Sequence, residues 1–116
     1  NQACIGKDII NEKNLNTIHF KMKQHLKLKK NAYINDIYYS PYYEFSKNSK
    51  YKMNKFDRKP NPGMLIKAVK KWNIDTKKSL FIGDNITDCI SSKAVKIKFY
   101  YKSNLKLISQ LKKIIQ

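Results

Sequence analysis

Cysteine is scarce in this chain, and its placement does not predict either of the structures that cysteine most often builds. The two cysteines among the 116 residues, Cys4 and Cys89, are far apart and lie in unlike sequence contexts. A disulfide framework uses several cysteines at regular spacings, and a zinc motif uses closely spaced pairs. These two residues therefore predict neither a disulfide framework nor a zinc motif.

Long apolar runs are lacking as well. No stretch of the sequence reaches the roughly 18 to 20 consecutive apolar residues of a membrane span, and no signal-peptide pattern is evident. At 116 residues the chain has the length of one small domain. We therefore expect one cytoplasmic domain, residues 1–116, with no membrane partner.

Arginine is nearly absent, although the chain is strongly basic. The formal charge is +17, but 24 of the 25 basic residues are lysine and only Arg58 is arginine. Lys, Asn, Ile and Tyr, which share A/T-rich codons, fill 59 positions, so drift in base composition explains the excess of lysine. A dedicated nucleic-acid binder uses arginine more often, for bidentate contacts. The charge alone does not predict a nucleic-acid partner, and Arg58 stands out against its background.

The first half of the sequence predicts one long helix, a short strand and a long loop. Asn11 is a candidate N-cap for a helix whose apolar residues recur at spacings of three and four. Those residues are Leu15, Ile18, Met22 and Leu26. A turn at residues 35–36 leads into a strand over residues 37–39, and periodicity is then lost over residues 40–57. Loops of that length in compact domains are usually functional or mobile.

Periodicity returns in the second half of the sequence. Asn61 is a candidate N-cap, with Pro62 in the first turn of a helix. Its apolar stripe consists of Met64, Leu65, Ala68, Val69 and Trp72. After a turn at residues 75–77, the continuous apolar run over residues 80–82 is typical of a buried parallel strand.

The last third predicts two more helices and one more strand. Gly83 is expected to let the backbone turn sharply before a helix over residues 87–93. Residues 95–101 alternate as in a strand, and Ser103 is expected to cap a final helix. The buried stripe of that final helix consists of Leu105, Ile108, Leu111 and Ile115. Alternating elements of this kind predict a layered α/β sheet with right-handed crossovers.

Two carboxylates follow the strand expected over residues 80–82. Ligands bind at the carboxyl ends of strands in open α/β sheets, where Gly83, Asp84 and Asn85 are expected to lie. Asp84 can occupy one position on Mg²⁺, and Asp88, one helical turn further on, can take an outer-shell role. Alternatively, both carboxylates simply favour the N-terminus of the following helix. These residues taken alone leave the two interpretations equal.

A pair of cations, Arg58 and Lys59, favours the first interpretation. Phosphoryl transfer needs positive charge on the nonbridging oxygens, which a lysine ammonium supplies, while a guanidinium adds a planar fork for another oxygen. The alternative is a solvated pair in a lysine-rich chain. Pro60 restricts the backbone after the pair, and Asn61 and Pro62 begin a helix, so the two side chains are attached to a rigid scaffold.

Several segments, in order, resemble motifs of the haloacid dehalogenase superfamily of phosphatases. Residues 58–64 (Arg-Lys-Pro-Asn-Pro-Gly-Met) and 83–88 (Gly-Asp-Asn-Ile-Thr-Asp) resemble its third and fourth motifs. The closest likeness is to the branch of D-glycero-D-manno-heptose 1,7-bisphosphate 7-phosphatases and histidinol-phosphatases. Residues 1–7 (Asn-Gln-Ala-Cys-Ile-Gly-Lys) resemble the end of that branch's second motif, and residues 37–42 (Ile-Tyr-Tyr-Ser-Pro-Tyr) resemble its Ile-Tyr-Tyr-Cys-Pro-His segment.

The resemblance implies roles by position. Lys59 would stabilise the transferring phosphoryl group, Asp84 would bind Mg²⁺, and Arg58 would contact the substrate. Asn1 and Gln2 would lie near the phosphate or the sugar. Asn85, at the predicted strand end beside Asp84, is a further candidate for substrate binding.

The chain departs from the family pattern at a zinc site. The branch often holds zinc through three cysteines and a histidine around the long loop, and Ser40, Tyr42, Lys55 and Asp57 occupy those places. Without thiolate or imidazole ligands, zinc is not expected to bind. Ala3 and Cys4 also replace the usual Ser-Gly of the second motif.

A second departure concerns the first motif, Asp-x-Asp, which supplies the nucleophile and the acid–base in this superfamily. The pattern does not occur in the 116 residues. The resemblance implies a three-layer, Rossmann-like parallel sheet in which the strand of the first motif and that of the second are central. We therefore expect the chain to be the C-terminal portion of a phosphatase, without its first two core strands and inactive in isolation.

Together these features predict a magnesium-dependent phosphomonoester hydrolase of a small phosphorylated sugar, with a heptose bisphosphate preferred. Histidinol-phosphatase and polynucleotide 3′-phosphatase remain alternatives within the superfamily. An alternative of another class is a non-catalytic, lysine-rich nucleic-acid-binding module, which steep salt dependence of DNA binding would reveal. The complete protein is expected to be a monomer.

Overall fold

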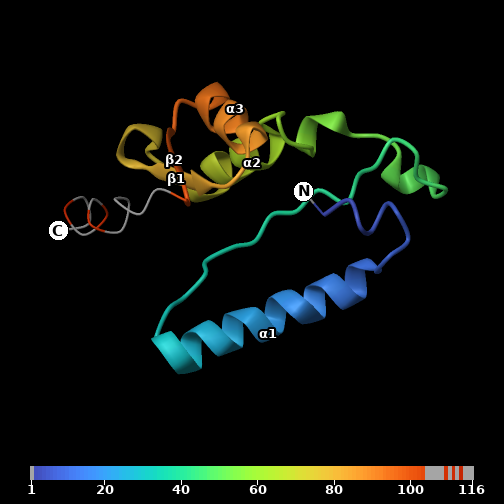
Figure 1. Ribbon diagram of the computed structural model, residues 1–116, viewed down its shortest axis with the longest axis horizontal. Coiled ribbons are helices and arrows are strands. Elements are labelled where there is room, and N and C mark those ends of the chain that lie inside the picture. The colour runs from blue at the N-terminus through green and yellow to red at the C-terminus, as the bar shows by residue number, and fades with distance from the viewer. Residues whose placement is uncertain (1, 104–108, 110, 112, 114–116) are drawn as a thin grey trace. The chain divides into compact units, whose positions relative to one another are not determined.

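The computed structural model describes residues 2–103, 109, 111 and 113, and the chain divides into two compact units (Figure 1). The first unit comprises Asn1–Asn54 and the second Lys55–Gln116. Helix α1 is the main element of the first unit. The second unit has a parallel sheet with helices around it.

Helix α1 (Glu12–Lys30) begins where the sequence predicts. The side chain of Asn11 is its N-cap, because Oδ1 accepts a hydrogen bond from the backbone N–H of Asn14 at 2.8 Å. Asn31 ends the helix in the left-handed conformation, with φ 48°. The long periodic stretch with a cap at its start was therefore a sufficient signal for this helix.

The predicted apolar face of α1 is buried at its N-terminal end only. Within this fully described helix, Leu15 is the one buried residue, at 3% exposure. Ile18 and Met22 are 54% and 40% exposed. The helix thus contributes little to a core beyond its first turns.

The strand predicted over residues 37–39 is wrong. Residues 31–43 have no regular secondary structure. Instead of pairing with a strand, the backbone N–H of Ile37 donates to Oδ1 of the preceding Asp36 at 2.9 Å. An Asp side chain competes with sheet hydrogen bonds in this way, and β-branched and aromatic composition did not overcome that competition.

A single carboxylate connects α1 to the loop that follows. Glu12 accepts hydrogen bonds from the hydroxyl of Tyr39 at 3.2 Å, Nζ of Lys50 at 3.0 Å and the hydroxyl of Tyr51 at 2.8 Å. The hydrogen bond from Lys50 is the largest cause that lowers the pKa of Glu12. A short 3₁₀ turn, η1 (Ser49–Tyr51), positions Lys50 and Tyr51. The long loop therefore has a defined anchor on the helix.

In the second unit, one βαβ segment forms the sheet. Strand β1 (Leu80–Gly83) and strand β2 (Lys98–Tyr101) are parallel, and helix α3 (Ile86–Ala94) connects them and contacts both. In the register of the pair, Gly83 lies opposite Tyr101. Both strands therefore end at the same edge. The prediction of an α/β fold with parallel strands is confirmed, while the wider sheet of the superfamily stays a prediction.

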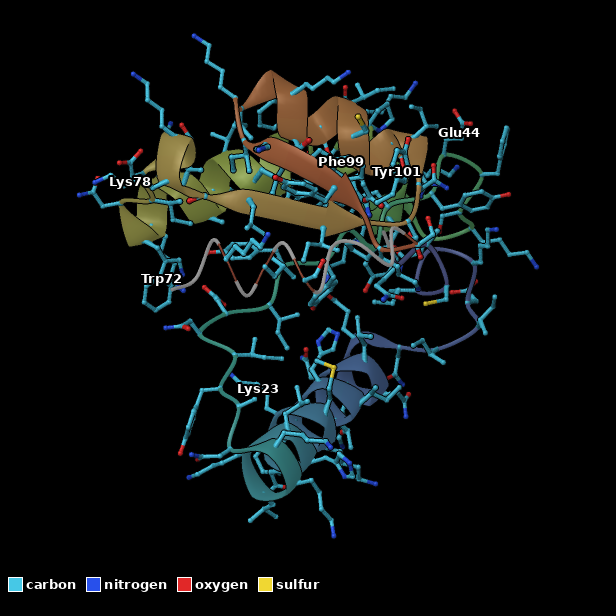
Figure 2. The ribbon with its side chains drawn as sticks, turned by 60° about the vertical axis from the view of Figure 1, so that its left-hand side comes forward. Lys23, Glu44, Trp72, Lys78, Phe99 and Tyr101 are labelled. Atoms are coloured by element: carbon cyan, nitrogen blue, oxygen red, sulfur yellow. The ribbon has the colours of Figure 1, made fainter. Side chains whose placement is uncertain are left out.

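Aromatic side chains pack along the sheet. The rings of Phe81 and Phe99 are stacked with centroids 5.9 Å apart, on adjacent strands. Phe99 and Tyr101, both labelled on β2 in Figure 2, pack edge to face at 4.9 Å. Cross-strand aromatic pairs stabilise a sheet beyond the area that they bury.

Helix α2 (Gly63–Trp72) differs from the prediction at its start. Pro62 occupies the N-cap position and no side chain caps the helix. Asn61 is not the N-cap, because its amide Nδ2 donates to the carbonyl of Lys55 at 2.8 Å instead. That bond holds the loop between α2 and the 3₁₀ turn η2 (Lys55–Asp57).

The strand predicted over residues 95–101 is shorter than expected. Val95 ends α3, and Lys96 has φ 58°, a left-handed conformation that a strand does not contain. The 3₁₀ turn η3 (Thr76–Lys78), capped by Asp75, confirms the predicted turn before β1. Alternation of apolar residues therefore located β2 but not its first residue.

The final predicted helix lies mostly outside the described residues. Residues 109, 111 and 113 are helical. Its expected positions Leu105, Ile108 and Ile115 lie outside the part that the structure describes. Across the described ranges, no helix is both long and apolar enough to cross a bilayer.

Candidate functional site

The candidate site lies at the carboxyl edge of the sheet, where β1 gives way to α3. Asn85 is the N-cap of α3, and its side chain accepts from the backbone N–H of Thr87 at 3.1 Å. Asp88 completes a capping box. Its Oδ2 accepts from the backbone N–H groups of Asp84 at 3.2 Å and Asn85 at 3.1 Å. The β1–α3 loop is therefore held by its own side chains.

Gly83 is required at the end of β1 by a close approach and not by its backbone angle. No glycine in the described part of the chain has a positive φ, so the turn after β1 does not use the left-handed conformation that favours glycine. A Cβ at this position would lie 2.6 Å from both Cβ and Oδ2 of Asp88. Absence of a side chain lets the Asp88 carboxylate reach the two backbone N–H groups.

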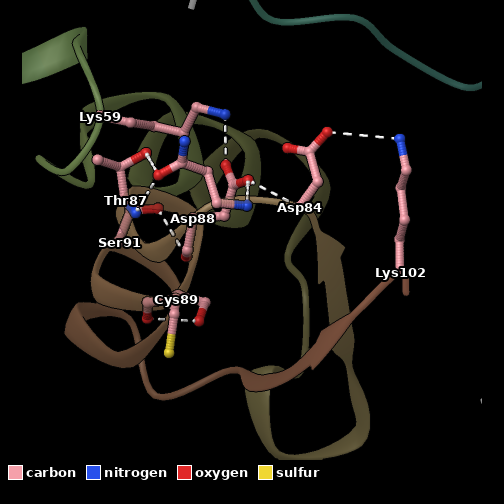
Figure 3. A network of polar contacts seen from close by, with 9 residues as sticks. Lys59, Asp84, Thr87, Asp88, Cys89, Ser91 and Lys102 are labelled. Carbon is pink, nitrogen blue, oxygen red and sulfur yellow. Dashed lines mark hydrogen bonds and ion pairs between the residues drawn. The ribbon is translucent and has the colours of Figure 1, made fainter. Parts of the chain in front are cut away.

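Lys59 and Asp88 form an ion pair at this edge, through Nζ and Oδ1 (Figure 3). The Asp88 side chain is 4% exposed and that of Lys59 is 25% exposed. Burial by itself raises the pKa of Asp88, but Lys59 and the N–H groups of Asn85 and Asp84 outweigh it, and the pKa is lowered. The carboxylate is ionised at neutral pH and holds the lysine ammonium in place.

A second, more exposed ion pair lies beside the first. Oδ2 of Asp84 is 3.4 Å from Nζ of Lys102, and both side chains are about two-thirds exposed, at 67% and 69%. The backbone N–H of Lys102 also donates to the carbonyl of Gly83 at 2.8 Å, just beyond the end of β2. Lys102 was not predicted as a site residue. The register of two parallel strands contained the signal, since residues that follow both strands meet at one edge.

The carboxylates differ in their capacity to bind a metal. Asp84 is exposed and offers the hard oxygen ligands that Mg²⁺ prefers. The oxygens of Asp88 already accept from Lys59 and two backbone N–H groups. In the described part of the chain, no cluster of three or more His, Cys, Asp or Glu side chains is arranged to hold a metal ion. The donor chemistry of Asp84 thus fits one ligand of Mg²⁺, a cation that keeps several waters and also binds phosphate oxygens.

For the other predicted site residues, the structure gives backbone contacts or no described position. Arg58 immediately precedes Lys59, and its carbonyl accepts from the N–H of Asn61 at 3.0 Å. Gln2 belongs to the first unit, where its N–H donates to the carbonyl of Ser40 at 2.8 Å. Asn1 lies outside the described residues. Lys59, Asp84, Asp88 and Asn85 are thus brought together within the second unit.

Comparison with known proteins gives a family and several relatives. Residues 50–102 match the family described as haloacid dehalogenase-like hydrolase. The chain is 40% identical over 65 residues to D-glycero-beta-D-manno-heptose-1,7-bisphosphate 7-phosphatase of Pasteurella multocida, covering 56% of this chain and 35% of that protein. The resemblance to haloacid dehalogenase-like hydrolases is confirmed.

Further relatives carry similar names. The chain is 29% identical over 97 residues to the enzyme so named from Rhodopseudomonas palustris, covering 84% of this chain and 53% of that protein. It is 34% identical over 88 residues to D-glycero-alpha-D-manno-heptose-1,7-bisphosphate 7-phosphatase of Photorhabdus laumondii, covering 76% and 48%. The chain spans about a third to a half of the length of these relatives.

The haloacid dehalogenase-like region contains the whole cluster at the sheet edge. Lys59, Asp84, Asp88 and Lys102 all fall within residues 50–102. Their contacts join α3, the ends of both strands and the loop before α2. The region that matches the family therefore includes every residue of this cluster, and the catalytic, metal-binding and substrate-binding roles of these residues stay predictions.

Proposed function

We propose that this chain carries part of the active site of a magnesium-dependent phosphomonoester hydrolase, with D-glycero-D-manno-heptose 1,7-bisphosphate as the substrate and its 7-phosphate as the group removed. Histidinol phosphate is the runner-up substrate within the same branch. The names of the relatives support the sugar substrate. The proposal concerns the complete protein, because the chain spans only part of the length of those relatives.

The observation that carries the proposal is the fixed ammonium of Lys59. Its partner Asp88 is buried and is itself held by two backbone N–H groups of the β1–α3 loop. A cation held in one position before the reaction stabilises developing charge on phosphoryl oxygens without reorganising during the reaction. Asp88 accordingly serves as the residue that positions Lys59, and its outer-shell role at the metal stays a prediction.

Asp84 supplies the metal side of the site. When bound, Mg²⁺ would neutralise phosphate charge and orient the phosphoryl group. Asp84 offers an exposed carboxylate at the same edge as Lys59. A phosphate at this edge would therefore meet two positive charges, that of the Mg²⁺ on Asp84 and that of the Lys59 ammonium. Arg58, next to Lys59 in the chain, is proposed to contact the rest of the substrate, and Asn85 a substrate hydroxyl or phosphate.

The proposal is tested by phosphate release from the product of the complete gene. Heptose 1,7-bisphosphate, histidinol phosphate and a 3′-phosphorylated oligonucleotide would each be assayed with Mg²⁺ and with a chelator. We expect release that depends on Mg²⁺ and is fastest with the heptose bisphosphate. Equal rates in the presence of the chelator, or no release from any of the three, would contradict the proposal.

A further inference from the structure

A hollow of about 300 Å³ lies along the C-terminal half of α1, in the first unit. Its lining comes from one face of the helix and from the chain that follows, and includes Phe20, Tyr33 and Ile34. Phe20 and Tyr33 are 61% and 69% exposed. Volumes of this size are at the lower end of those that bind small molecules.

A turn folds the chain back along the helix and places Tyr33 and Ile34 beside it, on one side of the hollow. Asn31 takes the left-handed conformation that ends α1, and its N–H donates to the carbonyl of Lys27 at 3.1 Å. The N–H of Ala32 donates to the carbonyl of Leu26 at 3.2 Å. The hydroxyl of Tyr33 donates to Oδ1 of Asn31 at 3.3 Å. Tyr33 is thus held where its ring forms one wall.

Two lysines border the apolar walls. Lys23 and Lys27 both line the hollow and stand one helical turn apart, and Lys23 is labelled on the helix in Figure 2. Nζ of Lys27 lies 5.9 Å from the centroid of the Tyr33 ring. Like charges at this spacing repel each other. An anion between the two ammonium groups would relieve that repulsion.

The charge around the hollow has one sign. Residues 13–35 contain six lysines and no Asp or Glu. A second copy of this chain would bring the same positive charge and is disfavoured as the occupant. A nucleic-acid backbone would need the lysines but not the apolar walls. An apolar body with an anionic group complements both features.

We propose that this hollow binds a small organic anion with an aromatic or otherwise apolar body. The body packs against Phe20, Tyr33 and Ile34, and the anionic group lies between the ammonium groups of Lys23 and Lys27. This proposal does not depend on the phosphatase activity, since every residue that it uses belongs to the first unit.

Naphthalene-1-sulfonate is a suitable probe, because it has an aromatic body and one permanent charge. Binding would be measured by titration calorimetry and located by amide shifts in NMR spectra of the full chain. Inorganic sulfate and 1-naphthalenemethanol separate the charge from the apolar body. The double variant Lys23→Gln/Lys27→Gln removes both charges, and Lys13→Gln/Lys21→Gln is a matched control on the same helix with the same net charge.

We expect one naphthalenesulfonate per chain, with shifts concentrated at residues 20–34 and much weaker binding of sulfate and of the alcohol. Removal of Lys23 and Lys27 should weaken binding about fivefold to tenfold, as two exposed ion pairs allow, while the control pair should change it less than twofold. Equal losses in the two double variants, sulfate binding as tight as that of the probe, or binding of an oligonucleotide but not of the probe would each overturn the proposal.

Discussion

Lys59 and Asp88 form an ion pair in which the acid, at 4% exposure, is far more buried than the base, at 25%. Asp88 also caps the start of α3 through the N–H groups of Asp84 and Asn85. The position of the lysine ammonium is therefore set by the loop at the end of β1. The Asp88 carboxylate thus binds both the β1–α3 loop and the ammonium of Lys59, so the conformation of the loop determines where that ammonium lies.

Replacement of Lys59 by Ala in the complete protein should lower kcat by about 10² or more, because a preorganised charge aimed at the transition state contributes about 3 to 4 kcal/mol. Steady-state kinetics with the heptose bisphosphate would measure the change. Lys70→Ala removes an exposed lysine from α2 and should leave kcat unchanged. Near-normal turnover in the Lys59 variant would remove the main support for the proposed function.

Replacement of Arg58 by Ala should mainly raise KM, as expected for a residue that contacts the substrate equally in the ground state and the transition state. The same kinetic series would measure it. A fall in kcat as large as that of the Lys59 variant would instead assign Arg58 to the reacting phosphoryl group.

Asp88→Asn should destabilise the second unit by about 1 to 3 kcal/mol, since it removes a charged hydrogen bond and leaves Lys59 without its buried partner. The folded-state pKa of Asp88 is lowered. The pair therefore contributes stability that is present above the unfolded pKa, about 4, and lost as pH falls through the lower folded value.

Urea unfolding at neutral pH and at progressively lower pH would measure this dependence. The free-energy difference between the original protein and Asp88→Asn should shrink as the solution is acidified. If the free-energy difference between the two proteins stays constant from neutral pH to pH values below the folded-state pKa of Asp88, the effect cannot be assigned to this ion pair.

Gly83→Ala should destabilise the protein by about 1 to 3 kcal/mol, as overpacking does. The new Cβ would lie 2.6 Å from Cβ and Oδ2 of Asp88. Chemical denaturation would measure the loss. In an Asp88→Gly background the same substitution should cost less, because the atoms that it meets are gone, and equal costs in both backgrounds would show that the two positions do not interact.

The sequence predicted the elements of this protein better than their ends. Asn11 and a long apolar period located α1, and a continuous apolar run located β1, because both signals are local. Asn61 was wrong as an N-cap since its amide binds the carbonyl of Lys55, six residues earlier in the chain. The prediction of a strand over residues 37–39 was wrong because local composition does not specify which segment, if any, a strand will pair with.

The site shows the same limit. Motif spacing singled out Lys59, Asp84 and Asp88 as candidates, and all three lie within the residues that match the family. That Asp88 pairs with Lys59 could not be read from the sequence, because the two are 29 residues apart and meet only through the fold. Lys102 was missed for the same reason, since its contact with Asp84 depends on the register of β1 and β2.

Elemental analysis of the purified protein should find no stoichiometric zinc. Two of the residues that occupy the zinc-ligand positions of the related branch are Ser40 and Asp57. Ser40 is fully buried, and Oδ2 of Asp57 forms an ion pair with Nζ of Lys67. A buried carboxylate that is already paired with an ammonium is a poor ligand for Zn²⁺, and thiolates are absent from these positions. One zinc per chain after purification in metal-free buffers would refute this prediction.

Lys102→Met should tighten the binding of Mg²⁺, or of Mn²⁺ as a spectroscopic substitute, by about two- to fivefold. Nζ of Lys102 lies 3.4 Å from Oδ2 of Asp84, so the ammonium competes with a metal for that carboxylate. The factor is modest because exposed ion pairs contribute about 0.2 to 1 kcal/mol.

Electron paramagnetic resonance of Mn²⁺ with the complete protein measures the affinity without reference to activity. Lys98→Met, at the other end of β2, removes the same charge away from Asp84 and should change the affinity less. Asp84→Asn should weaken binding of the metal in either background. Weaker binding in Lys102→Met than in the unmodified protein would mean that the lysine orients Asp84 for the metal and does not compete with it.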